Sequence, residues 1–259
     1  MPSSLTDLTP PDLAALLVFV AAWLGYGVVI HAVRSERSIV VRMLGVRRSW
    51  MHAMLGRDNR ITDASLIATC TGSATFFAST TMVALAAMLG LLGHFEQTYA
   101  AVGELAFTAK TSRAVLELKL LLVVLVFVHA FLKLTWAIRQ LNYCVALIGG
   151  APLKPAAEQR DAIADRAATV ITLAVGSFNG GIRGYYFALV AFSWLLGPFV
   201  MLAATLGILA LLLWRQLGSD TAAAIGASHE TYLGAASHGA GDVGPSLLRG
   251  AARPEGARA

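Results

Sequence analysis

Four long apolar stretches, separated by polar and arginine-rich segments, set the pattern of this chain. They cover residues 12–33, 64–92, 118–138 and 185–214. A helix rises about 1.5 Å per residue, so about 20 apolar residues cross the roughly 30 Å hydrocarbon core of a bilayer. Each stretch is long enough to do so. The sequence therefore predicts an all-α, polytopic membrane protein with four transmembrane helices.

The composition agrees with this pattern, since 57% of the 259 residues are hydrophobic and only 14% are charged. Soluble domains carry roughly a quarter charged residues. The net charge of +5 does not indicate a nucleic-acid partner, because the basic residues are grouped beside the apolar stretches and not on a soluble basic domain. Scarce lysine beside abundant arginine, alanine and glycine favours a protein from a GC-rich bacterial genome.

The segment between the first two stretches determines the expected orientation. Its arginines are Arg34, Arg37, Arg42, Arg47, Arg48, Arg57 and Arg60, whereas the N-terminal tail, residues 1–11, has no Lys or Arg. By the positive-inside rule the arginine-rich segment is cytoplasmic. With four spans, the short N-terminal tail and the C-terminus are then both expected outside.

Two shorter helices are expected on the cytoplasmic side. Residues 38–55 repeat apolar residues at helical spacing among arginines, which is typical of an amphipathic helix in the headgroup plane. Before the fourth stretch, an apolar run of only 12 residues predicts a short interfacial helix over 158–178. The alternative is a fifth span, which would place the C-terminus inside. Residues 218–259 are rich in Gly, Ala and Ser, and we expect them to be disordered.

The third stretch carries polar residues where they are costly. One helical face holds His129, Lys133, Trp136, Gln140 and Tyr143. Ionisable groups inside a span are candidates for function, so this polar stripe predicts a polar cavity. In the alternative interpretation Lys133 reaches the headgroups and His129 bonds a neighbouring helix. Acidic residues are absent from all four stretches apart from their end turns. A ligand or solute in this cavity is therefore expected to be anionic or neutral.

A second candidate site is formed by the end of the third stretch and the start of the fourth. Both ends are expected at the cytoplasmic interface, where they form a rim of two arginines, three amides and three tyrosines: Arg139, Gln140, Asn142, Tyr143, Asn179, Arg183, Tyr185 and Tyr186. A guanidinium fork binds phosphate or carboxylate bidentately, so the rim predicts binding of anionic lipid headgroups. The alternative is an interfacial belt of aromatic residues and arginines.

Other features indicate structural roles. Arg60 and Asp63 begin the second stretch, which continues with small and hydroxyl residues suited to helix packing. Pro198 predicts a kink within the fourth stretch. Cys70 and Cys144 lack metal-ligand spacing, and neither a metal site nor a cofactor is expected. Since no catalytic motif or paired carboxylates occur, we expect a protein that is not an enzyme.

Three motifs together resemble a known bacterial family. They are ATFFASTTM in the second stretch, IRQLNY at the end of the third, and FNGGIRGYYF, with Trp194 and Pro198 after it. The chain is similar over Leu13–Asp220 to the membrane family named domain of unknown function 599. The resemblance implies a multi-span inner-membrane protein and no particular activity. It marks as motif positions Arg139, Asn142, Asn179, Arg183 and Tyr186.

The sequence thus favours an accessory or scaffold protein. Its expected partners are anionic membrane lipids and either another copy of the chain or a partner membrane protein. The alternative function is a transporter or channel for a small solute or anion, lined by His129, Lys133 and Trp136.

Overall fold

The computed structural model describes residues 8–32, 39–104, 111–217, 220–221 and 223–225. In chain order its helices are α1 (Pro10–Ala32), α2 (Ile39–Leu55), α3 (Ile61–Gly93), α4 (Phe95–Glu104), α5 (Arg113–Gly150), α6 (Ala157–Ser193), the 3-10 turn η1 (Trp194–Leu196) and α7 (Pro198–Leu217). No strand occurs in these ranges. Most of the two tails, residues 1–11 and 218–259, lies outside the described residues. The second tail is the segment for which disorder is predicted.

Four helices, α1, α3, α5 and α7, are long and apolar enough to cross a membrane. This confirms the predicted class, an all-α polytopic membrane protein. The first three agree with the predicted stretches, although α5 runs on to Gly150 and adds the IRQLNY segment to the same helix.

The fourth predicted span, residues 185–214, is wrong as a single helix. The structure joins its beginning to the predicted interfacial segment in one 37-residue helix, α6, and starts a new helix, α7, at Pro198. Gly197 has φ 132° and ψ 163°, a conformation available essentially to glycine alone. Pro198 has no N–H to continue the preceding helix but is well suited to the first position of the next one. The expected kink is therefore a complete reversal of the chain.

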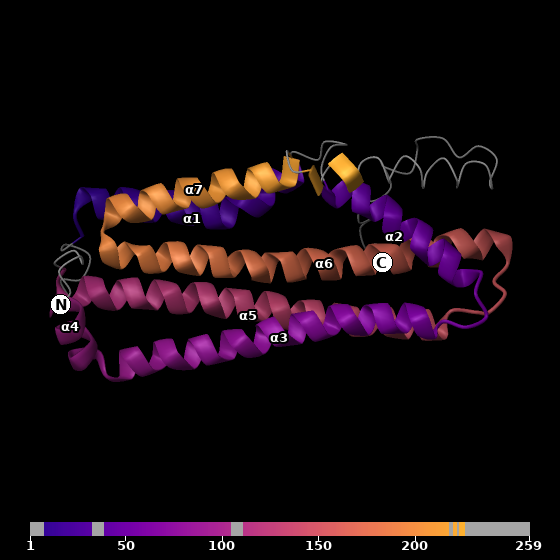
Figure 1. Ribbon diagram of the computed structural model, residues 1–259, viewed down its shortest axis with the longest axis horizontal. Helices are drawn as coiled ribbons and strands as arrows, with labels where there is room; N and C mark the ends of the chain where they lie inside the picture. Colours follow the sequence, from indigo (N-terminus) through magenta and orange to yellow (C-terminus); the bar gives the residue numbers. More distant parts are fainter. Residues whose placement is uncertain (1–7, 33–38, 105–110, 218–219, 222, 226–259) are drawn as a thin grey trace, which may run out of the picture.

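Because of this reversal, five long helices lie along the molecule and alternate in direction: α1, α3, α5, α6 and α7 (Figure 1). Pro10 and Leu217 lie toward opposite ends of the bundle. This arrangement agrees with the alternative of a fifth span, and the side of the membrane on which each terminus lies stays a prediction. We call the end at which α4 lies the α4 end, and the opposite one the α2 end.

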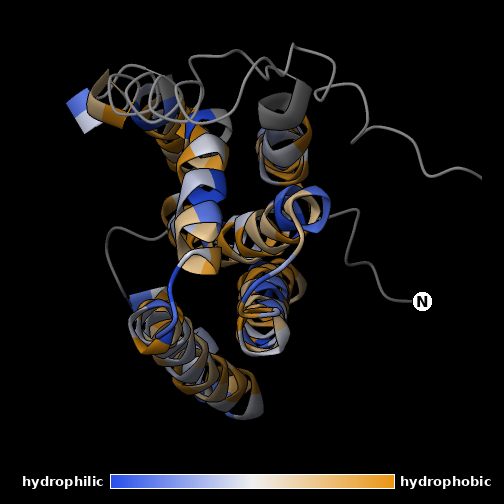
Figure 2. Ribbon diagram, turned by 90° about the vertical axis from the view of Figure 1, so that its right-hand side faces the viewer, coloured by the Kyte–Doolittle hydropathy of each residue, from blue (hydrophilic) through white to orange (hydrophobic). Residues whose placement is uncertain are grey.

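The long helices differ in length, and the excess is all at the α2 end. At about 1.5 Å per residue, the 38 residues of α5 and the 37 of α6 extend about 55 Å, whereas the 20 residues of α7 extend about 30 Å. The ends of α3, α5 and α6 therefore continue past α1 and α7 (Figure 1). Viewed from this side, hydrophilic segments gather at the near ends of the helices (Figure 2).

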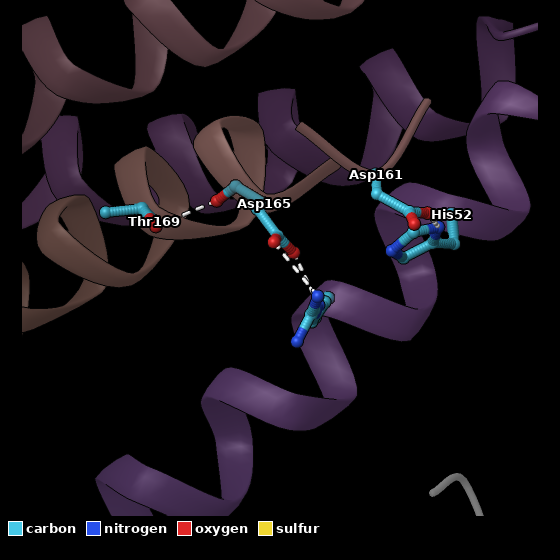
Figure 3. A network of polar contacts seen from close by, with 5 residues as sticks. His52, Asp161, Asp165 and Thr169 are labelled. Atoms are coloured by element: carbon cyan, nitrogen blue, oxygen red, sulfur yellow. Dashed lines mark hydrogen bonds and ion pairs between the residues drawn. The ribbon is translucent and has the colours of Figure 1, made fainter. Parts of the chain in front are cut away.

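Helix α2 packs on this extension. Met51, Met54 and Leu55 are buried in a hydrophobic core at the α2 end. The alanine-rich face of α6 and the adjoining parts of α3 and α5 form the rest of this core. Figure 3 shows Asp161 and Asp165 of α6 directed toward α2. Asp165 forms an ion pair with Arg48, and Asp161 lies 3.5 Å from Nδ1 of His52. The apolar side of α2, predicted to lie among lipid headgroups, thus covers protein instead.

Two glycines of the FNGGIRGYYF segment set the spacing of α5 and α6. A Cβ at Gly181 would lie 2.5 Å from Cγ of Leu134, and one at Gly184 would lie 2.5 Å from Cβ of Ala130. Such distances are shorter than any van der Waals contact. The two helices approach this closely only because both positions lack a side chain.

Candidate anion-binding site

A cavity of about 170 Å³ lies between α1, α5 and α6. Its lining combines aromatic, basic and glycine residues from the three helices: Trp23, Leu24, Gly27, His129, Lys133, Gly180, Arg183, Gly184 and Phe187. None of these described lining residues is acidic. The cavity is therefore a basic site with apolar walls.

Three basic side chains meet in the cavity. His129 and Lys133 are one turn apart on α5, and Arg183 comes from α6. A Cβ at Gly180 would lie 3.6 Å from Cδ of Lys133 and 3.6 Å from Nη2 of Arg183. Lys133 and Arg183 thus converge over Gly180, although they are 50 positions apart in the chain.

Aromatic residues of α1 hold two of these groups. The ring of Trp23 lies edge-on to the imidazole of His129, with centroids 5.3 Å apart. The Arg183 guanidinium carbon lies 5.1 Å from the centroid of the Tyr26 ring. Such cation–π contacts favour the charged form of the arginine in a poorly solvated site.

Buried aromatic and aliphatic residues close the cavity toward the α4 end. Phe19, Val126 and Phe187 are at most 1% exposed, and the rings of Phe19 and Phe187 pack edge-on at 5.9 Å. Beyond this apolar layer, Trp194 Nε1 donates a hydrogen bond of 2.8 Å to Asp12. Lys119 is buried beside them, and its ammonium has no hydrogen-bond partner in the described part of the chain.

The cavity lies level with the last turn of α7. Arg215, in that turn, donates a 3.0 Å hydrogen bond to the Tyr186 hydroxyl, and Arg183 lies three residues before Tyr186 on α6. Along α5, Lys133 is about 21 Å from Lys119, the buried lysine near the α4 end. The basic cavity is therefore near one end of the apolar part of the bundle, on the α2 side.

Only part of the predicted polar stripe lines the cavity. His129 and Lys133 do so, whereas Trp136 and Tyr143 are each about half exposed on the surface of α5. Gln140 is buried and accepts a 2.7 Å hydrogen bond from the Ser177 hydroxyl. Of these three residues past the level of the cavity, Gln140 is the one that is buried against α6.

The predicted rim is not brought together as one surface. Arg183 lines the cavity, whereas Arg139, Asn142 and Asn179 are exposed and lie outside its lining. The two tyrosines separate as well. The Tyr185 hydroxyl donates to the Phe77 carbonyl of α3 at 2.7 Å, while Tyr186 pairs with Arg215 of α7.

Arg60 and Asp63, the entry to the second predicted span, serve the architecture of the α2 end. Arg60 donates to three carbonyls at the end of α5, those of Ile148, Ala151 and Pro152. It thereby satisfies acceptors that a helix end leaves open. Asp63 is fully buried and accepts hydrogen bonds from Trp50 Nε1 and Arg57 Nη1, at 2.7 and 2.6 Å.

Sequence reasoning missed the contribution of α1. Trp23, Tyr26 and Gly27 stand in a stretch that looks uniformly apolar, so the stretch was read only as a span. One local feature could have indicated a site here: Trp23 and Tyr26, two aromatic residues with polar atoms, are three positions apart and lie beside glycines. Their relation to Arg183 and His129 depends on tertiary contacts.

All these residues fall within a stretch shared with other proteins. The sequence model of a family described as "Protein of unknown function, DUF599" matches residues 14–221. The chain belongs to this family. The resemblance seen in the three motifs is thereby confirmed, and the DUF599 match contains the whole lining of the cavity. Comparison with curated proteins and with solved structures gave no match.

Proposed function

We propose that this DUF599 protein is a non-enzymatic accessory protein that binds the anionic headgroup of a membrane lipid in the cavity between α1, α5 and α6. The observation that carries the proposal is the convergence of His129, Lys133 and Arg183 on a cavity without an acidic lining residue. Arg183 is partly buried, with its guanidinium over the ring of Tyr26, and a positive charge that water reaches poorly is costly unless it is paired. A bound anion removes that cost.

The surroundings of the cavity favour a lipid over a water-soluble anion. Leu24 of α1 lines the cavity and is 57% exposed, and Leu132, next to Lys133 on α5, is 58% exposed. In a bilayer such side chains face acyl chains. A lipid with its headgroup at the three basic groups would lay its chains against them.

The orientation we propose follows from charge bias. The arginines of α2 and of the segment before α3 favour a cytoplasmic location of the α2 end. With α6 as a fifth crossing, α1 begins outside and α7 ends inside. From Ala167 to Ser193, Arg183 is the one charged residue of α6. Arg183 and the glycines lower the hydropathy of this part of the helix, but neighbouring helices shield it. The cavity would then receive lipids of the cytoplasmic leaflet of a bacterial inner membrane.

The test is lipid co-purification measured by native mass spectrometry. Arg183→Ala should lower the amount of bound anionic lipid at least fivefold. Arg139→Ala is the matched control, because it also removes one arginine but from an exposed position outside the cavity. Equal lipid occupancy in wild-type protein and Arg183→Ala, with both folded, would refute the proposal. Equal losses of bound lipid in the two variants would assign binding to the rim that contains both Arg139 and Arg183.

A second candidate function is a carrier for a small organic anion. It is favoured by Lys119, a buried lysine on the far side of the layer formed by Phe19, Val126 and Phe187. A carrier must open this layer toward Lys119, and would then exchange labelled anion across proteoliposomes. Exchange that Lys133→Leu abolishes would support the carrier over the lipid-binding protein. The predicted association with another copy or a partner protein stays a prediction.

A further inference from the structure

We propose that the bound lipid carries a terminal phosphate, that is, a phosphomonoester headgroup of the kind found in phosphatidic acid. This inference rests on the proposed function and narrows its ligand. It is argued from the charge, the donor arrangement and the size of the cavity.

Charge balance favours a ligand with more than one negative charge. Lys133 and Arg183 are two cations, and His129 adds a third when it is protonated. No acidic residue offsets them among the described lining residues. A phosphomonoester carries a charge of about −1.5 to −2 at pH 7, whereas a phosphodiester carries one negative charge. Only the monoester neutralises both permanent cations.

The donors are arranged for a group with several free oxygens. Lys133 and Arg183 approach Gly180 from α5 and α6: Nη2 of Arg183 and the methylene carbon Cδ of Lys133 each lie 3.6 Å from the position of a Cβ on Gly180. His129 lies one turn from Lys133, supported by Trp23. A terminal phosphate has three non-bridging oxygens and can accept from all three side chains, while a diester has two.

The space available suits a compact headgroup. The cavity volume is about 170 Å³, below the about 300 to 1,000 Å³ of pockets that hold drug-sized ligands. Trp23 and Phe187 form walls. The second glycerol or the sugar of a diester headgroup would therefore have to share this volume with the phosphate. Gly27 adds to the open space, since no atom lies within 4 Å of a Cβ built on it.

The experiment compares two lipids with identical chains. Purified full-length protein in neutral phosphatidylcholine nanodiscs is titrated by native mass spectrometry with dioleoyl phosphatidic acid and with dioleoyl phosphatidylglycerol. We expect at least tenfold tighter binding of phosphatidic acid at pH 7.5. Inorganic phosphate and glycerol phosphate, tested in competition at millimolar concentration, should displace little of the lipid.

Each other outcome has a definite meaning. Equal binding of the two lipids would overturn the phosphomonoester inference and leave the proposed headgroup function standing. No preference for either over phosphatidylcholine would overturn both. Displacement by inorganic phosphate at micromolar concentration would identify a free phosphate as the ligand and remove the lipid from the proposal.

Two variants connect the preference to this cavity. Gly27→Leu fills open space, since its Cβ has no atom within 4 Å, and should weaken phosphatidic acid binding at least tenfold. Gly25→Leu is its control, because Gly25 has equally free surroundings on the same helix but does not line the cavity. His129→Gln replaces the ring by a side chain of similar size that carries no charge. It should reduce the preference for phosphatidic acid, measured as the ratio of the dissociation constants of the two lipids. An unchanged ratio in folded His129→Gln and unchanged binding in Gly27→Leu would place the ligand elsewhere.

Discussion

Gly184 of α6 lies so close to Ala130 of α5 that a Cβ at position 184 would be 2.5 Å from Cβ and 3.2 Å from Cα of Ala130. The second of these atoms belongs to the backbone and cannot rotate away. A side chain at position 184 therefore requires the two helices to separate. This contact also holds Arg183 at the level of His129 and Lys133.

Gly184→Ala should destabilise the protein by about 1 to 3 kcal/mol, the usual cost of overpacking a core. Gly176→Ala, on the same helix, has no atom within 4 Å of the new Cβ, and should be neutral or stabilise by up to about 1 kcal/mol. Thermal unfolding in detergent, followed by circular dichroism, measures both. Equal midpoints for the two variants would contradict the role of the close approach.

Asp63→Asn should cost about 1.5 to 3 kcal/mol, because a buried carboxylate loses charge-assisted hydrogen bonds. Its partners, Trp50 and Arg57, connect α2 and the following turn to α3. Asp58→Asn removes the same charge from an exposed position nearby and should change stability by less than about 0.5 kcal/mol. Unfolding midpoints that fall equally in both variants would show that net charge, not the buried pairing, matters.

Trp194→Phe should destabilise the junction of α6 and α7 by about 1 to 3 kcal/mol, since Asp12 loses the donor of a buried hydrogen bond. It also removes the indole ring whose centroid lies 5.5 Å from the Lys119 ammonium. Trp214→Phe is the control, because that indole is 61% exposed on α7. Equal stability of the two variants in the same unfolding assay would contradict this assignment.

The chain reversal at Gly197 makes a prediction about topology. Single cysteines at Thr111, Asn59 and Gln216, in a background without Cys70 and Cys144, can be labelled with a membrane-impermeant maleimide in intact cells. With five crossings, Asn59→Cys and Gln216→Cys label alike and Thr111→Cys labels from the opposite side. Labelling of Gln216→Cys together with Thr111→Cys would restore the four-span order.

Much of the fold was predictable because helix formation and membrane insertion depend on local composition. Three of the four apolar stretches are helices close to their predicted positions. The fourth was misplaced at Gly197, where a glycine before a proline can indicate either a kink or a reversal. Whether α7 turns back depends on the packing of α1 and α7 against each other, and no local pattern records that packing.

The candidate site was predictable in its residue types and only partly in its arrangement. His129 and Lys133 stood out as ionisable residues inside a span, and Arg183 as a cation in a glycine-rich motif. From the sequence, the depth of these residues in the membrane follows from the expected ends of the third and fourth spans, and this predicts that Arg183 lies beside Arg139. The antiparallel register of α5 and α6, set by Gly181 and Gly184, instead pairs Arg183 with Lys133.

The sequence by itself determined that this is an all-α membrane protein with basic residues inside its third span, because hydropathy and helical period are properties of each segment alone. Only the tertiary structure decided which of those residues meet. The contact of Gly184 with Ala130 and the packing of Trp23 and Tyr26 of α1 join residues far apart in the chain. Their distances depend on how three helices pack, and from that packing comes a cavity with three basic groups and no acidic residue among its described lining.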